Sequence, residues 1–149
     1  MTVVRRCSYA ALCLAALISM SGCGSKAHTV QPAAEVSIKH ELLRGVADLR
    51  TIRDPQKLYP KLAQVRARLR QAHPATDSER RGLKLALQGF GETLQGVQSR
   101  IDFIVNDSGN PPNATRDAGK ADQFLNRGAN RLRAAGRALG IELGDINGY

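Results

Sequence analysis

The most restrictive feature of the sequence is a row of apolar residues that recur at alternating intervals of four and three. The row consists of Leu83, Leu87, Phe90, Leu94, Val97, Ile101 and Ile104. This spacing, continued over three heptads, places the seven side chains on one face of an α-helix and is typical of helices that pack nearly side by side. The chain is therefore expected to be all-α, with this helix ending before a turn at residues 106–112.

Three other segments carry the same kind of pattern, at about residues 34–52, 55–72 and 113–139. Their apolar rows are Ile38, Leu42, Val46 and Leu49; Leu58, Leu62, Val65, Leu69 and Ala72; and Ala118, Ala121, Leu125, Gly128, Leu132, Ala135 and Leu139. Four amphipathic helices with short turns predict an up-down antiparallel bundle. The alternative is a bundle of three, in which the first two segments form one kinked helix.

Residues at the expected helix ends support these boundaries. Asp54 can cap the second helix, with Pro55 at its first position. The spacing of Thr76 and Glu79 is that of a capping box before the third helix. Gly140 stands where a C-cap glycine belongs, and residues 142–149 are expected to form a frayed tail.

Three glycines, Gly82, Gly89 and Gly96, recur every seven residues beside the apolar row of the third helix. Each costs about 1 kcal/mol relative to alanine inside a helix. We therefore expect a close contact with the fourth helix, which has a row of small residues at Ala121, Gly128 and Ala135. The alternative is that the glycines have no packing role.

The first 23 residues have the layout of a secretory signal. Arg5 and Arg6 precede an apolar stretch at residues 9–20, and the small residues Ser21 and Gly22 lead into Cys23. An uncleaved membrane anchor and an ordinary signal peptide are the alternatives. The apolar stretch is short for a membrane span, which takes about 20 residues.

The segment Met20-Ser21-Gly22-Cys23 resembles the lipobox of bacterial lipoproteins, although Met20 stands where leucine is most frequent. The resemblance implies that the Cys23 thiol receives a diacylglyceryl group with acyl chains such as palmitate. It also implies cleavage between Gly22 and Cys23. The expected organisation is a signal peptide at 1–22, an acylated cysteine and flexible tether at 23–33, a helical bundle at 34–141 and a C-terminal tail at 142–149.

The mature domain carries no motif for catalysis, metal binding or cofactor binding. All three cysteines lie at or before Cys23, and no HExxH, CxxCH or GxSxG motif is present. His28, His40 and His73 are interpreted as surface residues. The acidic residues of the first helix, Glu35, Glu41 and Asp48, are interpreted as a solvated face. We therefore expect a non-enzymatic protein without a metal or cofactor.

The chain is strongly basic, with 22 Lys and Arg against 13 Asp and Glu and a formal charge of +9. Removal of Arg5 and Arg6 with the signal leaves +7. Arg116, Lys120, Arg127 and Arg131 form a basic stripe on the fourth helix, opposite its apolar row. This stripe suits anionic lipid or an acidic envelope polymer, and plain solvation is the alternative. The export signal makes nucleic acid the least expected partner.

These features predict an exported lipoprotein, anchored to a bacterial membrane and facing outside the cytoplasm. Its bundle would act as an interaction module that contacts a protein partner or an envelope component. The alternative is a carrier of a small apolar ligand between the helices, which would need an enclosed void of roughly 300 Å³ or more.

Overall fold

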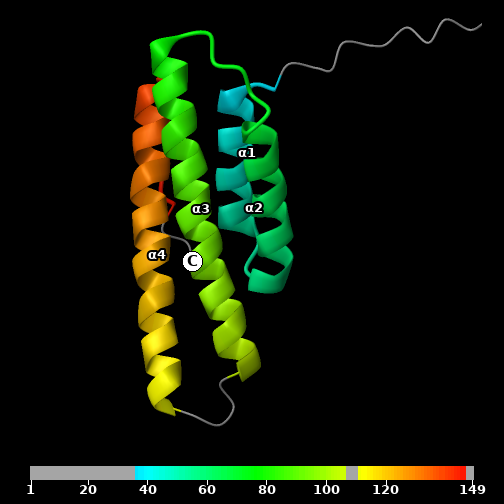
Figure 1. Cartoon of the computed structure of the whole chain (residues 1–149), viewed down its shortest axis with the longest axis vertical. Coiled ribbons are helices and arrows are strands. Elements are labelled where there is room, and N and C mark those ends of the chain that lie inside the picture. The colour runs from blue at the N-terminus through cyan, green and yellow to red at the C-terminus, as the bar shows by residue number, and fades with distance from the viewer. Residues whose placement is uncertain (1–35, 107–110, 147–149) are drawn as a thin grey trace, which may run out of the picture. The chain divides into compact units, whose positions relative to one another are not determined.

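The computed structural model describes residues 36–106 and 111–146, except for the side chains of residues 106 and 111–114. All regular elements in these ranges are helices: α1 (Ile38–Thr51), α2 (Pro55–Leu69), α3 (Asp77–Asn106) and α4 (Pro111–Ala138) (Figure 1). The prediction of an all-α bundle is therefore confirmed. The first two segments form separate helices, which settles the count in favour of four.

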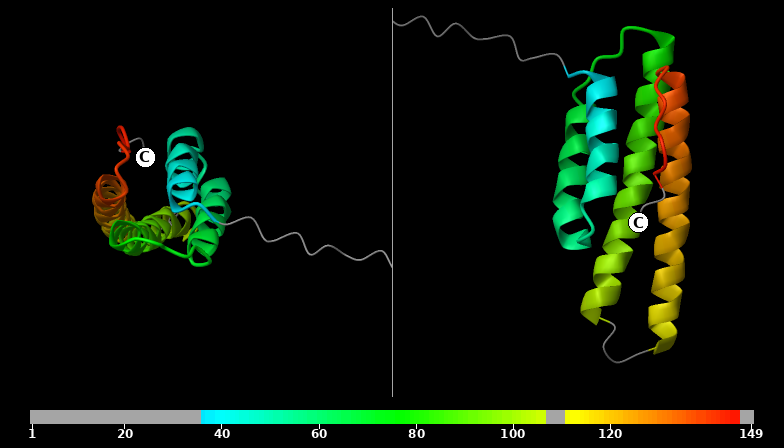
Figure 2. Two further views of the ribbon diagram at one scale, coloured as in Figure 1. Left: turned by 90° about the horizontal axis from the view of Figure 1, so that it is seen from above. Right: turned by 180° about the vertical axis from the view of Figure 1, so that it is seen from behind.

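Two antiparallel hairpins of unequal length build the bundle (Figures 1 and 2). The long α3 and α4 make the most extensive contact, and α2 packs on α3 while α1 packs on α2. Every residue of the predicted apolar rows of α1 and α2, together with Ala72, is buried. The largest fully buried side chain is that of Phe90, which α3 contributes to this core.

The apolar row of α3 is buried in its middle and exposed near its end. Phe90, Leu94 and Val97 are buried, whereas Ile104 is 59% exposed, so its predicted place in the core is wrong. The reason is the difference in helix length. Helices α1 and α2 have 14 and 15 residues, and they cover only part of the 30-residue α3.

Local capping contacts fix the beginning of each of the first three helices. Ser37 Oγ accepts the His40 N–H at 3.4 Å, and Asp54 Oδ1 accepts the Gln56 N–H at 2.9 Å. Before α3 the predicted capping box is confirmed. Thr76 Oγ1 accepts the Glu79 N–H at 3.1 Å, and Glu79 Oε2 accepts the Thr76 N–H at 3.1 Å.

The Glu79 carboxylate accepts a second backbone N–H, that of Ala75, at 2.8 Å. The two backbone hydrogen bonds lower the pKa of Glu79 from its ordinary value because they favour the charged form. The bond from Ala75 has the larger effect and the bond from Thr76 the smaller one. The N-terminus of the longest helix is thus held by a carboxylate that stays ionised into the acid range.

A Schellman motif ends α4. Gly140 has a φ of +67°, a conformation that residues with a Cβ rarely adopt. The Ile141 N–H donates to the Gly136 carbonyl at 2.9 Å, and the Gly140 N–H donates to the Arg137 carbonyl at 3.2 Å. The predicted C-cap glycine is confirmed.

The glycine row of α3 receives a row of leucines from α4. A Cβ at Gly82, Gly89 or Gly96 would lie 2.5, 2.9 or 2.7 Å from Cγ of Leu139, Leu132 or Leu125, respectively. From one glycine to the preceding one, seven residues earlier in α3, the contacting leucine changes to the one seven residues later in the chain. The predicted close contact is confirmed, and the glycines accommodate leucines of α4 in addition to its small row, since a Cβ at Gly96 would also lie 3.0 Å from the Ala121 oxygen.

The small row of α4 adds a second close approach. A Cβ at Gly128 would lie 3.0 Å from the backbone oxygen of Gly89 and 3.0 Å from the backbone nitrogen of Thr93. Thr93 itself is buried and donates its hydroxyl proton to the Gly89 carbonyl at 2.9 Å. The backbones of the two helices therefore come close at this level of the hairpin.

The segment after α4 packs against the bundle, so the prediction of a frayed tail is wrong for residues 142–146. Ile146 is only 6% exposed and belongs to the core, and Leu143 packs against it. Arg50 of α1 donates its Nε–H to the Asp145 carbonyl at 2.8 Å. Helix α1 makes few contacts with α4, and this segment lies between the two helices (Figure 2).

None of the helices in the described ranges combines the length and the apolar character needed to cross a bilayer.

Candidate functional site

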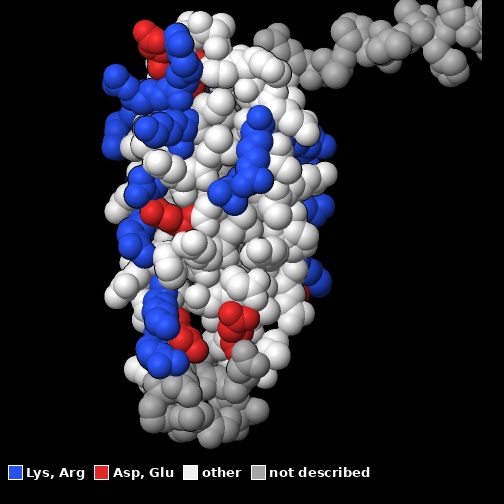
Figure 3. Space-filling model, in the orientation of Figure 1, with Lys and Arg blue, Asp and Glu red and all other residues white. Residues whose placement is uncertain are grey.

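Three residues of the basic stripe on α4 are exposed, and each has a neighbour on its own helix. Arg116 and Lys120 both lie 3.7 Å from the Asp117 carboxylate. The Arg127 guanidinium stacks over the ring of Phe124, with 4.7 Å between Cζ and the ring centroid. Figure 3 shows basic side chains along this edge of the molecule, with acidic groups between them.

The fourth residue of the stripe, Arg131, turns toward α3. Its Nε–H donates to Glu92 Oε2 at 2.8 Å, and its Nη1 donates to Gln88 Oε1 at 2.8 Å. The Arg131 side chain is still 42% exposed, but unlike the other three its guanidinium is held by residues of another helix. It forms part of the wall of a surface groove, which we call the Arg66 groove.

The Arg66 groove is an open depression of about 840 Å³, with α3 as its floor and α2 and α4 as its walls. Polar and apolar side chains both line it. The lining residues are Tyr59 and Arg66 of α2, Leu87, Gln88, Gly91, Glu92, Leu94, Gln95, Gln98 and Ser99 of α3, and Phe124 and Arg131 of α4.

Arg66 lies across the floor of the groove at Gly91. A Cβ at Gly91 would stand 3.3 Å from Arg66 Nη2 and 3.5 Å from its Cζ, so the absence of a side chain makes room for the guanidinium. The Arg66 Nε is buried and has no hydrogen-bond partner within the described ranges. No carboxylate there forms an ion pair with Arg66, since Glu92 of the same groove is engaged by Arg131.

The groove has a cationic end and an aromatic end. Tyr59 lies seven residues before Arg66 on α2, and Phe124 lies seven residues before Arg131 on α4. Two turns of helix separate each pair, which is about 10 Å at 1.5 Å per residue. Because Arg66 lies against Gly91 and Arg131 bonds to Glu92, both arginines lie at the same level of α3, and the two aromatic rings lie about two turns away.

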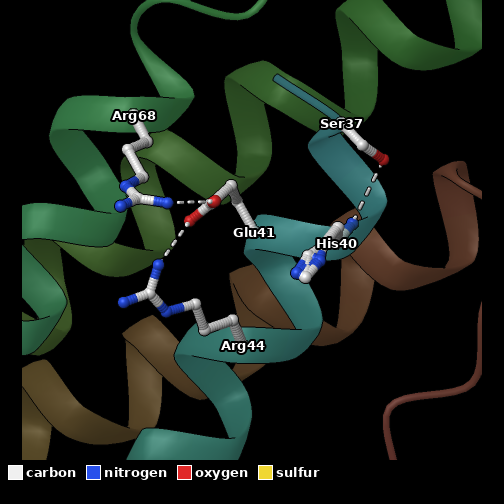
Figure 4. Close-up of polar contacts among 5 residues, drawn as sticks. All are labelled: Ser37, His40, Glu41, Arg44 and Arg68. Carbon is white, nitrogen blue, oxygen red and sulfur yellow. Dashed lines mark hydrogen bonds and ion pairs between the residues drawn. The ribbon is translucent and has the colours of Figure 1, made fainter. Parts of the chain in front are cut away.

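A separate cluster of charges joins α1 to α2 (Figure 4). Glu41 is only 6% exposed, so its predicted place on a solvated face is wrong. Arg68 of α2 reaches Glu41 Oε1 with its Nη1 at 3.2 Å, and Arg44 lies 3.9 Å from Oε2. The cluster links the two short helices through a buried carboxylate and two partly exposed guanidinium groups, so we assign it a structural role.

Asp48 of α1 is half-buried and its Oδ2 is buried, so its predicted place on a solvated face is also wrong. The other predicted residues fall into two groups. His40 and His73 are exposed, and in the part of the chain that the structure describes no group of three His, Cys, Asp or Glu side chains is placed to hold a metal ion. Gly22, Cys23, His28 and Glu35 lie outside the described residues, as does the expected tether.

The sequence does not distinguish Arg66 from the other basic residues of α2. Arg66 differs from the other basic residues of α2 in lying opposite Gly91, a residue 25 positions away on another helix. The only signal in the sequence is a glycine of α3 outside the seven-residue row, and this glycine does not indicate which residue packs against it.

Comparison with known proteins gives no relative from which a function could be inferred: no protein-family model, curated protein or solved structure matches the chain.

Proposed function

We propose that the protein is an exported bacterial lipoprotein, anchored through acylated Cys23, whose helical bundle acts as a non-enzymatic interaction module at the cell envelope. The observation that carries this proposal is the order of features at the N-terminus. Two arginines, an apolar stretch and small residues lead directly into Met20-Ser21-Gly22-Cys23.

The close packing of the bundle suits a protein that binds partners through a rigid surface. The interlocked leucines and glycines of α3 and α4 leave little freedom for these helices to move apart. A lipid anchor adds to this by confining the bundle to the membrane surface, where tethering raises its effective concentration toward nearby partners.

Exposed cations on α4 support a further contact with anionic lipid or an acidic envelope polymer. Arg116, Lys120 and Arg127 are solvated, and a cation close to an anionic surface contributes about 1 kcal/mol. This contribution is enough to orient a domain that is already tethered.

The alternative function, transport of a small apolar ligand, calls for an enclosed apolar cavity between the helices. The Arg66 groove is open to solvent and is lined by arginine, glutamate and glutamine side chains as well as leucines. Its form favours recognition at the surface over enclosure of a cargo.

The anchor is tested by intact mass spectrometry and detergent partitioning of the protein from a bacterial host. We expect a chain that begins at Cys23, carries acyl groups and enters the detergent phase, whereas Cys23→Ala accumulates as the unprocessed precursor. Cys13→Ala, a cysteine change within the apolar stretch, is the matched control and should be processed normally. A soluble product without acyl groups would overturn the lipoprotein proposal.

A further inference from the structure

We propose that the Arg66 groove is a binding site for an acidic peptide segment of a partner protein, with Arg66 as the residue that binds its carboxylate. This inference rests on the proposed role as an interaction module. It does not depend on the lipid anchor.

The charge of the groove points to an anion. Arg66 and Arg131 bring two positive charges to its cationic end, and Glu92 neutralises one of them through its contact with Arg131. Because the Arg66 Nε is buried, a ligand in the groove could reach this partly exposed side chain only through its Nη groups. A guanidinium forms its strongest contacts with carboxylates, which can accept two of its N–H groups at once. A carboxylate on the ligand would therefore bind Arg66 through the Nη groups.

The length of the groove favours a peptide over a compact anion. Its floor runs along α3 from Leu87 to Ser99, which corresponds to about 18 Å of helix. Between its two ends lies Gln95, whose amide offers both a donor and an acceptor for a peptide backbone. A single small anion at Arg66 would leave most of this surface unused.

The distance between the two ends of the groove predicts the spacing between two side chains of the ligand. The aromatic end, with Tyr59 and Phe124, lies about 10 Å from the Arg66 end. An extended peptide advances about 3.3 Å per residue. A ligand that uses both ends therefore carries an Asp or Glu and, about three positions away, a large apolar residue.

This inference is tested by selecting phage-displayed random heptapeptides on the full chain in detergent. The immobilised proteins are the wild type, Arg66→Gln and Arg70→Gln. Arg70 is the matched control because it is exposed, lies four residues after Arg66 at the C-cap of α2 and does not line the groove. We expect the wild type and Arg70→Gln to enrich peptides with an acidic residue and an apolar residue about three positions apart.

The selected peptides are then synthesised and their affinities measured. Arg66→Gln should weaken binding by at least about tenfold, as expected for loss of a charge-assisted hydrogen bond, and Arg70→Gln by less than about twofold. Circular dichroism compares the folding of the variants. If Arg66→Gln does not fold, Arg66→Lys takes its place, because it retains the charge but loses the planar pair of donors.

Three results would overturn the proposal: no enrichment above background, enrichment without acidic residues, or equal enrichment on Arg66→Gln. Vesicles that contain phosphatidylglycerol are tested in parallel. Vesicle binding that requires Arg66, together with a failed peptide selection, would replace the peptide by a lipid headgroup. Failure of the anchor would appear in the mass of the chain and not in these selections, so the two proposals fail separately.

Discussion

At the scale of single residues, three charged side chains in the described structure have a buried polar atom without a hydrogen-bond partner: Glu41, Asp48 and Arg66. Such an atom carries a desolvation cost of about 1–3 kcal/mol. Glu41 offsets this cost through Arg68, which reaches its other carboxylate oxygen at 3.2 Å. Arg66 lines the groove, where its Nη groups, and not the buried Nε, are the atoms that a ligand carboxylate could bind.

The capping carboxylate Glu79 is expected to make stability depend on acid pH. Its pKa is lowered in the folded protein, so its contribution is fully present above the pKa of the unfolded chain and is lost as the pH falls through the folded pKa. Thermal unfolding at pH 6 should show Glu79→Gln to be less stable than the wild type, because glutamine can cap but carries no charge. This difference should shrink as the pH is lowered toward 3. A difference that is independent of pH would show that the charge of Glu79 does not contribute.

At the scale of elements, the contact between α3 and α4 depends on residues without side chains. Leucines of α4 lie where a Cβ on α3 would collide with them, and Gly128 lies against the backbone of Gly89 and Thr93. A leucine can adjust its rotamer to relieve a collision, but a helix backbone can only move as a whole. A Cβ at Gly89 or Gly96 would also meet one backbone atom of α4, at 3.1 or 3.0 Å, whereas a Cβ at Gly128 would meet two backbone atoms of α3, both at 3.0 Å. Gly128 is therefore expected to be the least replaceable of the three.

Substitution of Gly128 by alanine is expected to destabilise the protein although alanine favours helix formation. The new Cβ would lie 3.0 Å from the Gly89 oxygen, and such overpacking costs about 1–3 kcal/mol beyond the gain in helix propensity. Gly119→Ala on the same helix is the matched control. It has nothing within 4 Å and should stabilise by about 0.5–1 kcal/mol. Chemical denaturation measures both, and equal effects would contradict the role of close packing.

How far the sequence predicts these elements depends on the range of the interactions. The caps at Asp54, Thr76 and Gly140 were predictable because each involves residues within a few positions of one another. The exposure of Ile104 was not, because it follows from the shorter length of α1 and α2. The burial of Glu41 likewise depends on Arg68, which another helix supplies.

The candidate site was the least predictable part of the structure. The sequence identified the basic stripe of α4, but it gave no indication that Arg131 bonds to Glu92 across the helix pair. It does not single out Arg66, because the relation of this residue to Gly91 exists only once α2 packs on α3. To predict a groove formed by three helices, one must know how the helices are aligned with one another along their axes. The apolar periodicity of a single helix does not reveal this alignment.

At the scale of the whole bundle, the segment after α4 acts as a fifth packing element. It connects α4 to α1 through the buried Ile146 side chain and through the hydrogen bond from Arg50 to the Asp145 carbonyl. These two helices otherwise have little contact. The short hairpin of α1 and α2 is thus held on both sides, by α3 and by the end of the chain.

Truncation of Ile146 to alanine is expected to cost about 2–4 kcal/mol, because its side chain is only 6% exposed and the lost contacts leave a cavity. Leu43→Ala removes a side chain of similar size that is 47% exposed, and it should cost less than about 1 kcal/mol. Thermal unfolding of the full chain followed by circular dichroism compares the two. A loss of stability for Ile146→Ala no larger than that for Leu43→Ala would contradict a stabilising role of this segment.

The seven-residue repeat shared by the leucines of α4 and the glycines of α3 also determines how this hairpin responds to force along its axis. Sliding by one helical turn would bring Leu132 from Gly89 to positions 85–86 or 92–93, all of which carry side chains. The next register that restores the match is two turns away, about 10 Å along the axis. A slide of one turn is therefore opposed by side-chain collisions. A load at one end is expected to displace the two helices together rather than past one another.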